Sequence, residues 1–123
     1  MITILAIAFA GALGSVLRYL LGRYVQTLTH FEFPIGTLMV NVVGCALVGA
    51  IARYFLNNET HPVMKAALVV GFCGGFTTFS SFGLETPALI NSGNWPKAMA
   101  YVAASTTASL TATALGFQFV LRR

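Results

Sequence analysis

Four long apolar runs, separated by short polar turns, make up nearly the whole chain. Polar positions are few within the runs, whereas the turns gather proline, asparagine and charged residues. A helix needs about 20 apolar residues to cross a hydrocarbon core of about 30 Å, so each run is long enough for one span. The pattern predicts an all-α membrane protein with a single domain, residues 1–123, and four transmembrane helices at about 2–21, 36–56, 63–90 and 97–120.

The third run differs from the others because glycine and hydroxyl residues interrupt it. Its stretch GFCGGFTTFSSFG, residues 71–83, places four glycines among hydroxyl residues and phenylalanines. Glycine weakens a helix, and irregular backbone at membrane depth is tolerated only where protein or a water-filled cavity covers it. The stretch therefore predicts a broken third helix, with the break near 74–78.

Composition narrows the functional class. Hydrophobic residues make up 57% of the chain, charged residues 8%, and the mean hydropathy is +0.81, whereas a soluble domain carries about 25% charged residues. The net charge of +4 comes from single Lys and Arg residues at the edges of the apolar runs, so we expect no nucleic-acid binding. The sequence contains no nucleotide-binding loop and no nucleophile–base–acid set, so we expect neither a nucleotide partner nor an enzyme.

Neither the start of the chain nor its cysteine and histidine residues changes this picture. Residues 1–13 carry no basic stretch ahead of the apolar run, so we expect a retained helix rather than a signal peptide. Cys45 and Cys73 fall inside apolar runs, and His30 and His61 lie far apart in the turns. Their spacing predicts neither a disulfide framework nor a side-chain metal site.

The basic residues leave the membrane orientation open. With four spans, one face has four basic residues and the other has three: Arg53, Lys65, Arg122 and Arg123 against Arg18, Arg23 and Lys97. Because an excess of Lys and Arg normally sets orientation, so small a difference predicts insertion in both directions. Two inverted copies can form a closed two-fold pair, so we expect an antiparallel dual-topology homodimer in which two broken helices cross near the centre.

Phenylalanines and hydroxyl residues alternate through the predicted break. Phe79 and Phe82 are three residues apart, so they can share one face of the half-helix that follows. Packing against lipid or protein accounts for such a pair. Alternatively, the ring edges, which carry the positive part of the aromatic quadrupole, line a narrow path for a small anion. Hydroxyl donors stand beside the rings: Thr77, Thr78, Ser80 and Ser81.

The second and fourth spans add polar groups at helical spacing. Tyr101, Ser105, Ser109 and Thr113 are four residues apart and form one polar stripe on an otherwise apolar helix. Such hydroxyls either bond to helix carbonyls and neighbouring helices or donate into a polar path. The amide of Asn41 either donates to an anion or ties two helices together.

Two charged residues complete the candidate site. Arg18 lies about one turn from the expected end of the first span, where it either snorkels to the interface or attracts anions into an aqueous vestibule. Glu85 follows Gly83, and we expect its carboxylate to accept hydrogen bonds from Ser80 or Ser81.

The stretch at 71–83, together with GTLMVNVVG at 36–44 and GSVLRYLLG at 14–22, resembles the Fluc (CrcB) family of fluoride channels over essentially the whole chain. The resemblance implies a dual-topology homodimer with two fluoride pores in a bacterial plasma (inner) membrane. This chain departs from the pattern at Ser81, where many relatives have threonine, and at Phe76, where they have an aliphatic residue.

The resemblance also implies roles for single residues. Phe79 and Phe82 match pore-lining phenylalanines, and Asn41 matches a pore asparagine. Tyr101 matches a tyrosine that donates into the pore. A structural Na⁺ at the dimer centre would be held by two backbone carbonyls of each copy, those of Gly74 and Thr77.

Residues and resemblance together predict a passive channel that exports fluoride and needs no enzyme chemistry. A pore for a strongly hydrated ion replaces the lost water with closely spaced donors. The expected lining is Asn41, Phe79, Phe82, Ser80, Ser81, Tyr101, Ser105 and Ser109, with Arg18 in the vestibule. A small multidrug-type proton-coupled exchanger, the first alternative, needs an acidic residue in the first helix, and residues 2–21 have none. The second, a non-transporting membrane assembly protein, would use the glycines and hydroxyls only for packing.

Overall fold

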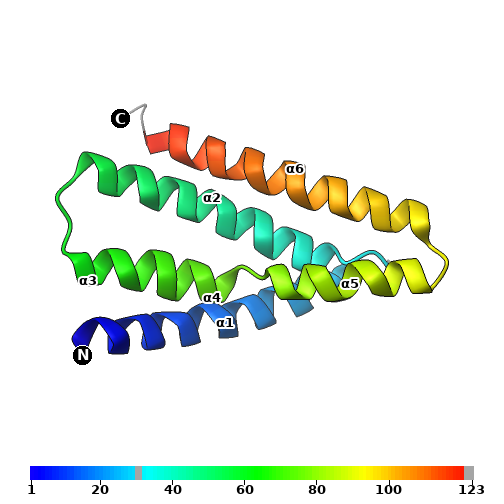
Figure 1. The fold of residues 1–123 in the computed structure, drawn as a ribbon, viewed down its shortest axis with the longest axis horizontal. Coiled ribbons are helices and arrows are strands. Elements are labelled where there is room, and N and C mark those ends of the chain that lie inside the picture. The colour runs from blue at the N-terminus through cyan, green and yellow to red at the C-terminus, as the bar shows by residue number, and fades with distance from the viewer. Residues whose placement is uncertain (30–31, 121–123) are drawn as a thin grey trace.

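The computed structural model describes residues 1–29 and 32–120, and nearly all of them are helical (Figure 1). In chain order the elements are α1 (Ile2–Leu28), α2 (Ile35–Asn57), α3 (Pro62–Lys65), the π-helix η1 (Ala66–Cys73), α4 (Gly74–Phe76), α5 (Phe79–Asn91) and α6 (Trp95–Phe119). The elements α3, η1, α4 and α5 follow one another along a single interrupted rod. His30, Arg122 and Arg123, which the sequence places in a loop and at the charged end of the chain, lie outside the described residues.

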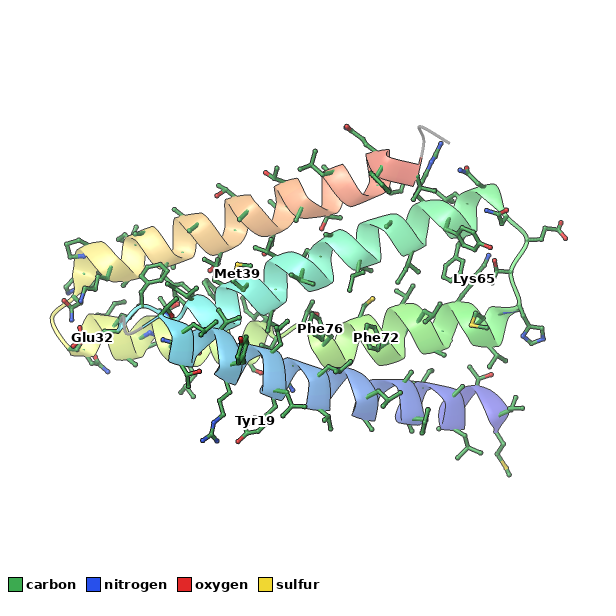
Figure 2. All side chains as sticks on the ribbon, turned by 180° about the vertical axis from the view of Figure 1, so that it is seen from behind. Tyr19, Glu32, Met39, Lys65, Phe72 and Phe76 are labelled. Carbon is green, nitrogen blue, oxygen red and sulfur yellow. The ribbon has the colours of Figure 1, made fainter. Side chains whose placement is uncertain are left out.

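The helices α1, α2 and α6 and the interrupted rod of α3 to α5 run side by side in alternating directions (Figure 1). The start of α1, the connection between α2 and α3, and the end of α6 lie at one end of the bundle. The connections from α1 to α2 and from α5 to α6 lie at the other. Glu32 and Lys65 mark these opposite ends (Figure 2).

Three segments of the described chain are long and apolar enough to cross a membrane: Ile2–Leu28, Ile35–Asn57 and Pro62–Asn91. The all-helical prediction is confirmed, and these segments indicate an integral membrane protein. The helix α6 has 25 residues, which at about 1.5 Å per residue is enough for a hydrocarbon core of about 30 Å. Its many serine and threonine residues make it more polar than the other rods, and its role as a fourth span stays a prediction.

The first helix is longer than its apolar run. It continues through Arg23 and Gln26 to Leu28, seven residues beyond the expected end at Leu21. Arg18 therefore lies ten residues before the end of α1, and its distance from the end of the membrane span stays a prediction. The apolar pattern could not predict this, because a helix can continue in water or at the interface after the apolar stretch ends.

Glycines let neighbouring backbones approach closely, and two contacts illustrate this. A Cβ atom added to Gly75 would collide with the carbonyl oxygen of Gly11, so α1 lies directly against the rod of η1 and α4. A Cβ atom on Gly116 would likewise collide with the carbonyl oxygen of Ala46, which joins α6 closely to α2. Small residues at helix contacts are typical of membrane bundles, where close backbone packing replaces the hydrophobic driving force.

The third rod is interrupted at Thr77 and Thr78, inside the predicted interval 74–78. Both residues have extended backbone, with ψ of 156° at Thr77 and φ of −147° at Thr78. The glycine pair at 74–75 is itself helical. Just before the break, Phe72 and Phe76 stack with ring centroids 5.9 Å apart (Figure 2), and Phe76 is buried.

Candidate functional site

The amide of Asn41 ties α2 to the break in the third rod. The backbone N–H of Thr78 donates to Asn41 Oδ1 at 2.7 Å, and Asn41 Nδ2 donates to the Thr78 carbonyl at 3.0 Å. Of the two roles that the sequence left open for Asn41, the structure shows the tie between helices. An amide nitrogen carries two N–H donors, so the bond to Thr78 uses only one of them.

The side chain of Thr78 begins the helix that follows. Its Oγ1 accepts from the backbone N–H of Ser81 at 3.1 Å, which is the usual bond of an N-cap residue. The same oxygen donates to Ser81 Oγ at 3.0 Å and contacts Ser80 Oγ at 3.1 Å. Thr78 is absent from the expected pore lining, although a threonine directly before an apolar helical run is a recognised helix-start signal.

These two side chains free two backbone carbonyls. In a continuous α-helix each N–H bonds to the carbonyl four residues earlier, so Thr78 would pair with Gly74 and Ser81 with Thr77. Here the Thr78 amide donates to Asn41 and the Ser81 amide donates to Thr78 Oγ1. The carbonyls of Gly74 and Thr77 therefore lose their helical donors. Oxygen ligands of this kind suit a hard cation, and the described residues hold no cluster of three or more His, Cys, Asp or Glu side chains that would offer another metal site.

A groove of about 300 Å³ beside the break gathers most of the expected pore residues. Its lining is mixed apolar and polar and comes from α2, the break, α5 and α6: Asn41, Cys45, Thr77, Thr78, Phe79, Phe82, Ser105, Thr106, Ser109 and Leu110. The hydroxyl of Ser105 is buried and has no hydrogen-bond partner among the described residues. A buried hydroxyl without a partner is costly, so this donor is available to whatever occupies the groove.

Aromatic rings form one wall of the groove. The rings of Phe79 and Phe82 lie 5.4 Å apart between centroids and are tilted by 45°, and Phe82 lies 5.3 Å from Tyr101. Phe79 is 82% exposed, so the groove is open on its side in the single chain. Its ring lacks the covering that a buried pore wall would have.

Tyr101 and Glu85 form a second polar group. Tyr101 is fully buried, and its hydroxyl donates to Glu85 Oε2 at 2.6 Å. Thr37 Oγ1 donates to the other carboxylate oxygen at 2.7 Å. The expectation that Glu85 accepts from Ser80 or Ser81 is wrong, because the carboxylate reaches across to α2 and α6 instead. Sequence reasoning missed Thr37, although it lies four residues before Asn41 and hence on the same face of α2.

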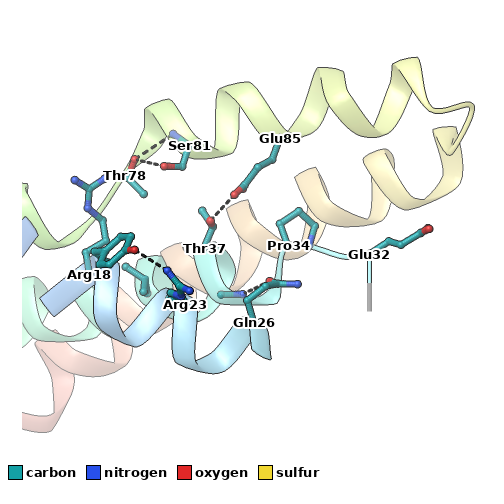
Figure 3. Close-up of a pocket in the computed structure, with 13 residues that line it drawn as sticks. Arg18, Arg23, Gln26, Glu32, Pro34, Thr37, Thr78, Ser81 and Glu85 are labelled. Atoms are coloured by element: carbon teal, nitrogen blue, oxygen red, sulfur yellow. Dashed lines mark hydrogen bonds between the residues drawn. The ribbon is translucent and has the colours of Figure 1, made fainter. Parts of the chain in front are cut away.

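A larger cavity of about 540 Å³ opens at the end of the bundle where α1 meets α2 (Figure 3). It is lined by charged and polar side chains that include Arg18, Arg23, Gln26, Glu32, Thr37, Thr78, Ser81 and Glu85. Arg18 Nε is buried and has no hydrogen-bond partner among the described residues. Thr78 lines both this cavity and the groove, so both reach the break.

The structure thus brings some of the expected residues together and leaves others apart. Asn41, Phe79, Phe82, Ser105, Ser109 and Thr77 line the groove, whereas Arg18 and Ser81 line the cavity. Tyr101, Ser80 and Gly74 line neither of the two. Ser80 and Gly74 are exposed at the surface of the single chain.

Comparison with known proteins gives a consistent result over nearly the full chain. Residues 5–117 match the family described as CrcB-like protein, Camphor Resistance (CrcB). The chain is 44% identical over 115 residues to the fluoride-specific ion channel FluC of Pseudomonas syringae pv. tomato, with 93% of each chain covered. It is 41% identical over 116 residues to the fluoride-specific ion channel FluC 2 of Rhodococcus jostii, covering 94% of this chain and 96% of that one. The fluoride-specific ion channel FluC of Nitrobacter winogradskyi is 45% identical to this chain over 118 residues, which cover 95% of this chain and 94% of the Nitrobacter protein.

Proposed function

The chain belongs to the CrcB family, whose matched relatives are channels and not enzymes, and we propose that it is a passive fluoride-selective channel of a bacterial plasma (inner) membrane. The observation that carries the proposal is that two linings share Thr78. An arginine-lined cavity and a groove with an amide, two rings and a partnerless hydroxyl share this one residue.

The chemistry of the lining suits a small, strongly hydrated anion. Fluoride gives up water only where closely spaced donors replace it. The second N–H of Asn41 and the hydroxyls of Ser105 and Ser109 supply such donors, and the edges of Phe79 and Phe82 present positive potential. Selection against chloride then rests on the narrowness of the path beside the rings. The hydroxyl of Tyr101 donates to Glu85, so Tyr101 acts on the path indirectly, through the Glu85 carboxylate.

An antiparallel dimer with two pores accounts for the open side of the groove. Phe79 is 82% exposed in the single chain, and a Cβ atom on Gly74 would meet only the Val69 carbonyl oxygen, at 3.8 Å. A second copy crossing at the break would cover both positions and close each groove. The near balance of basic residues in the sequence supports the inverted arrangement of the two copies.

A structural Na⁺ at the dimer centre would use the carbonyls that the break sets free. Two copies would present the carbonyl oxygens of Gly74 and Thr77 to one another, and a cation between them offsets the repulsion of their dipoles. When bound, the ion would supply positive charge and fixed geometry at the crossing. The residues of each chain keep the backbone extended there, through Asn41 and Thr78.

Export follows from the acid chemistry of fluoride together with the membrane potential. Hydrogen fluoride is a weak acid that crosses as the neutral molecule and ionises in the more alkaline cytoplasm. A potential that is negative inside then drives the anion outward through an open path. No coupled proton or nucleotide is required, and α1 contains no acidic residue for an exchanger mechanism.

The test is anion efflux from proteoliposomes loaded with fluoride or chloride. The efflux is followed with ion-selective electrodes after the liposome membrane has been made permeable to potassium. We expect fluoride efflux and no chloride efflux above that of empty liposomes. Phe82→Ile should abolish the fluoride signal, whereas Phe9→Ile, a matched change at an exposed position of α1, should not. Equal rates for both anions, or equal effects of the two variants, would refute the proposed path. An imposed proton gradient should leave the flux unchanged, in contrast to an exchanger.

A further inference from the structure

An exposed ion pair stands at the rim of the arginine-lined cavity. Lys97 Nζ, in the first turn of α6, lies 2.8 Å from Glu32 Oε2 in the connection between α1 and α2. It is the one ion pair among residues 1–29 and 32–120. The hydrogen bond and positive charge of Lys97 lower the pKa of the Glu32 carboxyl below its usual value. Glu32 is therefore an ionised carboxylate at neutral pH.

The formal charges on the cavity wall cancel without this lysine. The positively charged lining residues are Arg18 and Arg23, and the negatively charged ones are Glu32 and Glu85. Glu85 is held by two neutral hydroxyl groups, and neither of them brings a positive charge to the carboxylate. Lys97 does not line the cavity, but it neutralises one of the two carboxylates that do. The cavity has an excess of positive charge only because Lys97 neutralises Glu32.

We propose that Lys97 sets the rate at which anions reach the path, by neutralising Glu32 at the mouth of the cavity. The inference rests on the proposed function and adds a residue that neither lines the groove nor touches the permeating ion. A cavity lined by one sign of charge focuses the field and raises the local concentration of the oppositely charged ion. An unpaired Glu32 would repel fluoride from the same opening. Lys97 is thus a positioning residue that acts through Glu32.

The effect has a size and a salt dependence that can be stated in advance. One unit charge about 10 Å from an anion in water changes its local concentration by about twofold. The Debye length is about 30 Å at 0.01 M salt and about 3 Å at 1 M, so the effect should be present at the lower salt and absent at the higher. A merely structural link between α6 and the connection would not follow this dependence.

The experiment compares initial fluoride efflux for wild type, Lys97→Gln, Glu32→Gln and the double variant, each purified and reconstituted. Efflux is measured at about 0.01 M and about 1 M ionic strength with an impermeant organic salt. We expect Lys97→Gln to be about twofold slower than wild type at low salt and equal at high salt. Glu32→Gln should be as fast as wild type or faster, and the double variant should return to the wild-type rate.

The double variant also controls for a change in membrane orientation. Removal of Lys97 takes one basic residue from the membrane face that already has fewer, and the single and double variants share that loss. A rate that stays low in the double variant, or a slow Glu32→Gln, would overturn the inference. So would a Lys97→Gln rate equal to wild type at low salt. Absence of fluoride flux in the wild-type protein would instead refute the proposed function, so the two failures are distinguishable.

Discussion

Asn41→Asp changes a single nitrogen atom into oxygen at the tie between α2 and the break. The carboxylate of the variant can still accept from the Thr78 N–H, as Asn41 Oδ1 does at 2.7 Å. Its other oxygen would face the Thr78 carbonyl, to which Asn41 Nδ2 now donates at 3.0 Å. The substitution therefore keeps the size of the side chain, removes one of the two bonds, and places a negative charge on the wall of the groove.

Two contributions to the effect can be separated. Leaving the Thr78 carbonyl without its donor costs about 1–3 kcal/mol, because Thr78 is buried. A fixed negative charge about 4 Å from an anion in the groove costs about 4 kcal/mol at an effective dielectric constant of about 20. Since about 1.4 kcal/mol is a factor of ten, anion occupancy beside residue 41 should fall by about three orders of magnitude. Fluoride efflux should fall to the level of empty liposomes.

The measurement is fluoride efflux from proteoliposomes, with elution from a sizing column to verify that the variant is folded. Asn58→Asp is the matched control, because Asn58 Nδ2 also donates to a backbone carbonyl, that of Tyr54, at 2.9 Å, but at an exposed position after α2. This control should conduct like wild type. A folded Asn41→Asp protein that conducts within about twofold of wild type would refute the assignment of Asn41 to the path, because a twofold change is far smaller than the fall that the Coulomb energy predicts.

Two further predictions concern the glycines. Gly75→Ala should lower the stability of the chain by about 1–3 kcal/mol, because its Cβ would collide with the Gly11 carbonyl oxygen. Gly83→Ala in α5 should instead raise the stability by about 0.5–1 kcal/mol, because no atom lies within 4 Å of the added Cβ. Thermal unfolding in detergent measures both, and the same sign for the two variants would contradict this reasoning. Gly74→Leu should leave the fold of the single chain intact but shift the protein from dimer to monomer on a sizing column, since its Cβ is open within one chain; undisturbed dimers would count against a crossing at the break.

The fold could largely be predicted from the sequence because apolar runs and turn residues mark the rods directly. The pattern is less informative at Arg23 and Gln26, where α1 continues beyond its apolar stretch. It also misses the π-helix η1, because a change of helix type alters backbone bonding without altering the hydrophobic pattern. The glycine pair at 74–75 correctly points to the break, yet the pair is helical, and Gly75 serves close contact with Gly11 instead.

The candidate site was less predictable because its key bonds join residues far apart in the chain. Asn41 and Thr78 are 37 residues apart, and no local pattern shows that one satisfies the backbone of the other. The carboxylate of Glu85 has serines within about one turn of its own helix, but the three-dimensional arrangement brings Thr37 and Tyr101 closer. Spacing along a helix predicts which side chains share a face, and it cannot identify their partners on other helices.

Because Thr78 is on both linings, the proposed path would make the cavity and the groove two resistances in series. In such an arrangement the slower section sets the current, and a change in the faster section is scarcely visible. The inference about Lys97 therefore requires that access from the water is the slower section in the wild-type protein. Narrowing the groove beside the rings should mask every effect of the rim, because the limiting resistance then lies beyond the shared threonine.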